Sequence, residues 1–80
     1  MDKIKEEVIN IIAKVMEISP SEIGLATTID STPMWNSMNH LCLINELEKF
    51  YQIKFSLDEA LELIGYEAII TIMRKKLSLL

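Results

Sequence analysis

The stretch that decides the fold is residues 35–55, WNSMNHLCLINELEKFYQIKF, in which a polar loop passes into an apolar helix. Asn36 is a favoured helix N-cap residue, so the pattern predicts a helix from about Ser37 to Tyr51. The apolar residues of this helix cover well over half of its circumference, which is more than one core-facing stripe requires. We therefore expect the helix to show some apolar side chains to solvent or to a partner. Its apolar residues are Met38, Leu41, Cys42, Leu43, Ile44, Leu47, Phe50 and Tyr51.

The end of that stretch, YQIKF, alternates apolar and polar residues as a β-strand does. It is short, and no other segment of the chain is suited to pair with it. We therefore predict an extended connector in which Ile53 and Phe55 reach the core.

One further main helix is predicted on each side of this region. Residues Ile4, Val8 and Ile11 begin a helical apolar pattern that continues to about Ile18, with Asp2 as its cap. A last helix is expected from about Tyr66 to Leu77. Its final turns hold Arg74, Lys75 and Lys76, whose positive charge suits a helix C-terminus.

Two capping boxes predict short helical turns. Ser19 with Glu22 fits one box, and Ser56 with Glu59 fits another that opens a short helix to about Leu63. Gly65 is placed to end that helix. Residues 24–36 form the only long irregular stretch, and the apolar residues scattered through it predict a loop packed against the core; they are Leu25, Ile29, Met34 and Trp35.

These elements predict a single all-α domain over residues 1–80, a four-helix bundle with three main helices, one short helix and a long first loop. The helical spacing of the apolar residues predicts which side chains are largely buried. They are Ile4, Val8, Ile11, Val15, Leu43, Leu47, Ile53, Phe55, Ile69 and Met73.

The charge distribution limits the kinds of partner. The net charge is −4, whereas a nucleic-acid-binding domain needs a basic face. No Lys or Arg lies between Lys14 and Lys49, so this acidic third would attract a basic protein partner. The alternative, a solvated acidic surface that keeps the protein soluble, is the reading that charge alone favours. No apolar run is long enough to span a bilayer and the start is not a signal peptide, so we expect a cytoplasmic, monomeric protein without membrane insertion.

Cysteine and acidic residues give little sign of a metal site. Cys42 is the only cysteine, which excludes an internal disulfide and a cysteine-based zinc site, and we interpret it as a buried, inert thiol. Asp58, Glu59 and Glu62 lack the spacing of a calcium loop, so we interpret them as a charged helix face and expect no metal.

Ser37 has two readings at the start of the second helix. It is either part of the helix cap alone, or a hydroxyl presented at the positive end of the helix dipole, where a phosphate would be stabilised. His40 lies three residues later on the same helix face. A Ser–His hydrolase would also need an orienting acid, an oxyanion hole and a pocket, so we expect no catalytic residue and a surface or half-buried imidazole.

The order of elements and the stretch around Ser37 resemble the acyl carrier protein family, which includes the thiolation domains of polyketide and peptide synthetases. In that family a serine, usually within Asp-Ser-Leu, starts the second helix; here Asn36-Ser37-Met38 stands at this place. The resemblance extends to EISPSEIG in the first loop, to LEKFYQIKF at the end of the second helix and to DEAL in the third, and it spans nearly the whole chain.

The resemblance implies that Ser37 receives a 4′-phosphopantetheine arm from coenzyme A, whose thiol carries an acyl or aminoacyl thioester. The implied partners are a phosphopantetheinyl transferase and the enzymes that load and use the arm. Asn36 stands where the family usually has Asp. It can still cap the helix, but it lacks the negative charge that helps the transferase. Cys42 and Lys49 replace residues that are often acidic in fatty-acid carriers, so we expect a carrier for a specialised biosynthetic pathway.

Residues near Ser37 form the predicted partner surface. It combines apolar contact with acids that aid encounter, and consists of Met38, Leu41, Cys42, Glu46 and Glu48. The alternative function is an unmodified helical interaction domain, either an unrelated adaptor or a carrier fold without an arm.

Overall fold

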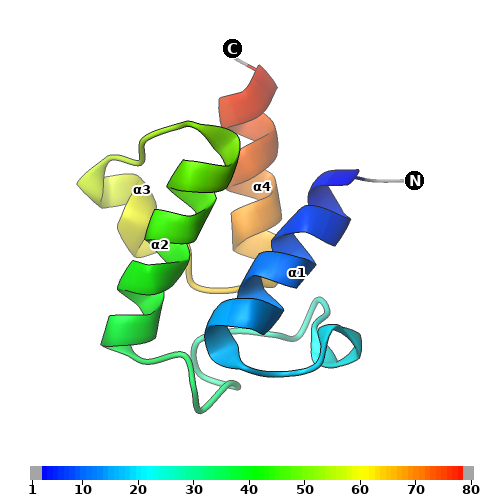
Figure 1. Cartoon of the computed structure of the whole chain (residues 1–80). Helices are drawn as coiled ribbons and strands as arrows, with labels where there is room; N and C mark the ends of the chain where they lie inside the picture. The colour runs from blue at the N-terminus through cyan, green and yellow to red at the C-terminus, as the bar shows by residue number, and fades with distance from the viewer. Residues whose placement is uncertain (1–2, 79–80) are drawn as a thin grey trace.

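The computed structural model describes residues 3–78, which form an all-helical domain with no strand beyond one isolated bridge (Figure 1). The predicted all-α fold of three main helices, one short helix and a long first loop is confirmed. The elements are α1 (Lys3–Met16), the 3₁₀ turn η1 (Pro20–Glu22), α2 (Ser37–Tyr51), α3 (Leu57–Glu62) and α4 (Tyr66–Ser78).

Helix α1 packs against both α2 and α4, while the short helix α3 packs against α4 and is joined to α2 by a hydrogen bond between His40 and Ala60 (Figure 1). The apolar stripes of the three long helices meet in one core, whose largest fully buried side chains are Val8, Ile12, Met16, Leu43, Leu47, Leu63, Ile69 and Met73. Two polar contacts add to the packing of α1 on α2: the Tyr51 hydroxyl donates to Glu7 at 2.9 Å, and Lys14 pairs with Glu46 at 3.1 Å.

Most of the predicted core is buried, and the exceptions lie at its margin. Ile4, Val15 and Phe55 are only half-buried and pack against the edge of the core. The side chains that are buried as predicted are Val8, Ile11, Leu43, Leu47, Ile53, Ile69 and Met73.

The helix ends follow from local capping. Both predicted capping boxes form, with Glu22 accepting from the Ser19 amide and Glu59 from the Ser56 amide. Helix α1 ends at Met16, before the predicted Ile18, because Glu17 turns into the left-handed region at φ 56°. The predicted cap Asp2 lies outside the described residues.

Residues 52–55 form the predicted connector. Gln52 ends α2 in the left-handed conformation, and its amide donates to the carbonyl of Glu48. Ile53 is buried, and the Phe55 amide donates to the Glu48 carboxylate at 2.9 Å. The amides of Gln52, Ile53 and Phe55 thus all donate to Glu48 and not to a partner strand.

The first loop is packed down only in part. Trp35 is buried, with 3% of its surface exposed, and Ile29 is half-buried. Leu25 and Met34 are exposed, so the prediction that the loop's apolar residues all anchor it was wrong for these two. Their neighbours hold the loop instead, because Thr27 and Thr32 are buried.

Gly65 has a different role from the predicted one. Leu63, not Gly65, caps α3, and Gly65 does not adopt a positive φ. Its value lies in close packing, since a Cβ atom at this position would lie 2.8 Å from the carbonyl oxygen of Thr27. The absence of a side chain thus lets the α3–α4 connection approach the first loop.

Replacing Gly65 by alanine is expected to lower the free energy of unfolding by about 1–3 kcal/mol, because the new methyl group would press on backbone that cannot rotate away. Urea unfolding followed by circular dichroism measures the effect. Gly24→Ala is the matched control, since its Cβ would meet nothing within 4 Å. Equal unfolding midpoints for the two variants would show that the close approach is not important for stability.

Candidate functional site

Ser37 is exposed and is the first residue of α2. Asn36 caps the helix as predicted, because its side-chain oxygen accepts from the Asn39 amide at 2.8 Å. The Asn39 side chain in turn donates to the Met34 carbonyl at 2.7 Å and fixes the loop over the helix start. The backbone amides of Ser37 and Met38 lie in the first turn of α2, at the positive end of the helix dipole. Ser37 is thus an accessible hydroxyl on a rigid, electropositive helix end.

A hydrogen-bonded chain joins the residues around Ser37 to α3. The indole Nε1–H of Trp35 donates to His40 Nδ1 at 3.0 Å, and His40 Nε2 lies 2.9 Å from the carbonyl oxygen of Ala60. Since Nδ1 accepts a hydrogen bond, the proton of the neutral ring belongs on Nε2, which donates to Ala60. Both ring nitrogens are therefore engaged away from Ser37.

This arrangement bears on the predicted role of His40. The ring is half-buried, as expected. A general base for Ser37 would need a free nitrogen within hydrogen-bonding distance of its hydroxyl. With Trp35 on one nitrogen and Ala60 on the other, the imidazole serves as a structural bridge.

Helix α3 has no fully buried residue of its own, although its C-cap residue Leu63 is fully buried in the core, and polar contacts attach the helix to its neighbours. The His40 bridge attaches it to α2, and Lys76 attaches it to α4 through a 3.0 Å contact with Glu59. The pKa of Glu59 lies below its usual value, first because the Ser56 amide donates to it and then because of Lys76. The sequence analysis did not predict the bridge from Trp35 through His40 to Ala60. Its only local signal was the presence of Trp35 and His40 on adjoining segments.

The exposed face of α2 begins beside Ser37. Met38 is 75% exposed and Leu41 is 64% exposed, which confirms that this helix shows apolar side chains to solvent. Cys42 is also exposed, so the interpretation of a buried thiol was wrong. The reason is the helical period: Leu43 faces the core, and Cys42 is rotated by about 100° from it.

Glu46 and Glu48 lie at the two edges of this face and have partners within the chain. Glu46 pairs with Lys14 of α1, and this contact holds the pKa of its carboxyl below the usual value. Glu48 accepts from the Phe55 amide on the connector side. Both carboxylates are therefore already engaged within the chain. A role for them in binding partners stays a prediction.

Helix α3 adds apolar residues that the sequence analysis did not assign to a site. Leu57 and Leu61 are both exposed and lie one turn apart on one face. Leu41 directly follows His40, and Leu61 directly follows Ala60, so both lie next to the hydrogen bond between the two helices. The signal in the sequence was the i, i+4 spacing of two leucines in a helix that is too short to bury both faces.

Two further findings concern metals and membranes. Among residues 3–78, no group of three or more His, Cys, Asp or Glu side chains is arranged to hold a metal ion. None of the helices described is long and apolar enough to cross a membrane.

Comparison with known protein families and with curated proteins gave no match to this chain. The residues around Ser37 are therefore the basis for any functional conclusion.

Proposed function

We propose that this protein is an acyl carrier protein in which Ser37 bears a 4′-phosphopantetheine arm. The observation that carries the proposal is an exposed serine at the first position of α2, beside an exposed apolar helix face. A carrier needs its arm on an accessible oxygen that is held by a rigid element. Ser37 meets both requirements.

The surroundings of Ser37 suit a phosphodiester. The first-turn amides of α2 and the positive end of its dipole favour a negatively charged group on this oxygen. Asn36 adds no charge of its own and engages the Asn39 amide. When bound, the arm would supply the thiol on which acyl or aminoacyl groups are carried. The chain itself would position the arm and present a docking surface.

The exposed residues beside Ser37 would form that docking surface. Met38, Leu41 and Cys42 are exposed on α2, and Leu57 and Leu61 are exposed on the neighbouring α3. Apolar side chains at the centre of an interface provide most of its affinity. We propose that the transferase and the enzymes that load and use the arm bind here, in a specialised biosynthetic pathway of the cytoplasm.

The decisive experiment treats three proteins alike with coenzyme A and a broad-specificity phosphopantetheinyl transferase: wild type, Ser37→Ala and Asn36→Asp. Intact-mass spectrometry follows modification with time. We expect wild type to gain the mass of one arm and Ser37→Ala to gain none. Asn36→Asp should be modified at least as fast as wild type, because it restores the charge of the resembling family's motif while a carboxylate keeps the cap.

Two outcomes would contradict the proposal. A gain in mass that persists in Ser37→Ala would mean that another residue is modified. If wild type resists several unrelated transferases while Asn36→Asp is modified readily, the chain is an unmodified interaction domain. The exposed apolar face of α2 would serve that second function equally well.

A further inference from the structure

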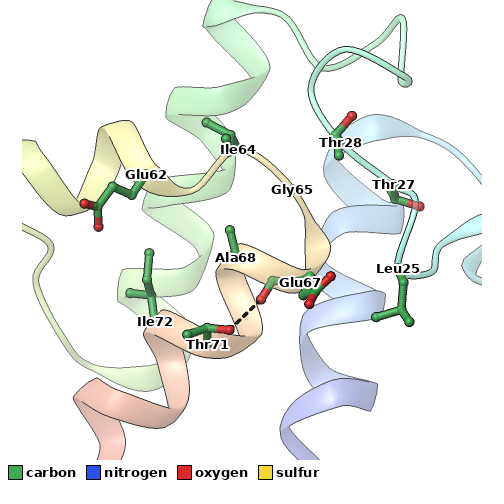
Figure 2. Close-up of a pocket in the computed structure, with 10 residues that line it drawn as sticks. All are labelled: Leu25, Thr27, Thr28, Glu62, Ile64, Gly65, Glu67, Ala68, Thr71 and Ile72. Carbon is green, nitrogen blue, oxygen red and sulfur yellow. Dashed lines mark hydrogen bonds between the residues drawn. The ribbon is translucent and has the colours of Figure 1, made fainter.

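A groove with a volume of about 510 Å³ lies away from Ser37, and Figure 2 shows the side chains that line it. Its walls come from the first loop, from the α3–α4 connection and from the first half of α4. No residue of α2 lines it, so the groove is separate from the surface beside Ser37.

The floor of the groove is built of backbone that is fixed at both ends. The Ile29 amide donates to the Ile64 carbonyl at 2.9 Å, and the Tyr66 amide donates to the Thr27 carbonyl at 3.0 Å. Between these bonds, Gly65 lies so close to Thr27 that even a methyl group would collide. The groove is therefore preformed, and a ligand would not have to order it on binding.

The groove presents large apolar side chains to solvent. Leu25 is 73% exposed and Ile64 is 51% exposed, although most large aliphatic residues of so small a domain are needed in its core. Ala68 and Ile72 are half-buried on α4. Figure 2 shows Ile64, Ala68 and Ile72 on one side of Glu67 and Leu25 on the other, so that a partner's aliphatic side chain would find apolar groups on both sides of the groove.

The hydroxyl groups that line the groove have partners within the chain. Thr27 Oγ1 accepts from the Gly24 amide at 2.9 Å, and Thr28 Oγ1 accepts from the Ser31 amide at 3.2 Å. Thr71 Oγ1 donates to the Glu67 carbonyl at 3.1 Å, as the dashed line in Figure 2 marks. The three threonine hydroxyls therefore stabilise the groove itself. Polar selection of a ligand is left to the charged residues of the groove.

The charged residues that line the groove are both acidic. Glu62 comes from the end of α3 and Glu67 from the first turn of α4, and Figure 2 shows them on different sides of Ala68. Both side chains are exposed, and no Lys or Arg lines the groove. The two carboxylates would repel an anionic ligand. A ligand with a cation beside an aliphatic group would match the groove twice, because the cation would meet the carboxylates and the aliphatic group would meet the apolar lining.

We propose that this groove binds a partner protein through a segment that places one aliphatic side chain between Leu25 and Ile64. A Lys or Arg of the same segment pairs with Glu62 or Glu67. The surface does not depend on the function proposed for Ser37, because no residue of α2 contributes to it. A carrier or an adaptor could use it while the other face is occupied.

A random peptide library, selected on the full-length protein and counter-selected on the Glu62→Lys/Glu67→Lys variant, tests the proposal. Enriched peptides should place Lys or Arg close to Leu, Ile or Met. A synthetic peptide of the enriched sequence should bind the Glu62→Gln/Glu67→Gln variant at least about tenfold more weakly than wild type. Leu25→Ser/Ile64→Ser should weaken it similarly, and both variants should keep the wild-type circular-dichroism spectrum because the changed side chains are exposed.

Two controls make the result specific. Glu6→Gln/Glu17→Gln removes the same charge at exposed positions outside the groove and should bind like wild type. Ser37→Ala should also bind like wild type, which separates this surface from the proposed modification site. The proposal is overturned if no peptide is enriched, if the enriched peptides are acidic, or if the Glu62→Gln/Glu67→Gln variant and its control bind equally well.

Discussion

Replacing Trp35 by alanine is expected to lower the free energy of unfolding by about 3–5 kcal/mol. The indole is almost completely buried, and its loss leaves a cavity beside the start of α2. It also removes the donor to His40, which attaches α3 to α2. A domain of this size is stable by only about 4–12 kcal/mol, so the variant loses a large share of its stability. Urea unfolding followed by circular dichroism is the suitable measurement, because Trp35 is the only tryptophan.

A second variant separates packing from hydrogen bonding. Trp35→Phe keeps much of the buried ring but has no Nε1–H for His40, so we expect a smaller loss of about 1–2 kcal/mol. Helix α3 should exchange its amide hydrogens faster in this variant than in wild type, since its attachment to α2 through His40 is weakened. A Trp35→Ala protein with wild-type stability would contradict the role of the buried indole.

Replacing Met38 or Leu41 by glutamate is expected to slow transfer of the arm to Ser37 by at least about tenfold, if the proposed function is correct. Both side chains are well exposed on the free protein, so the substitutions should leave the helix content and the unfolding midpoint nearly unchanged. Their cost arises on binding, because a charge would enter the apolar centre of the interface. Intact-mass time courses with transferase and coenzyme A measure the rates.

The matched control is Phe50→Glu, which also replaces an exposed apolar residue of α2 but lies at the opposite end from Ser37. It should be modified at the wild-type rate. If all three variants react like wild type, the transferase docks elsewhere. If Phe50→Glu is slowed as much as Met38→Glu, the effect reflects total charge and not a local surface.

The sequence by itself determined the features that depend on residues a few positions apart. The cap at Asn36 and the two capping boxes formed as predicted, since each requires only a side chain and an amide two or three residues away. The helical periodicity likewise predicted the number and type of helices and the centre of the core. Ser37 at an exposed helix start follows from the same local signals.

Only the tertiary structure decided which apolar residues remain exposed and which polar groups meet. Apolar character alone suggested that Cys42 and Leu25 would be buried, but both are exposed, because the neighbouring elements cover other sides of α2 and of the first loop. The bridge from His40 to Ala60 joins residues that are 20 positions apart, and no local pattern encodes such a contact. The role of Gly65 depends in the same way on the distant Thr27 carbonyl. These contacts arise from the placement of whole helices, which is set by packing over the entire core.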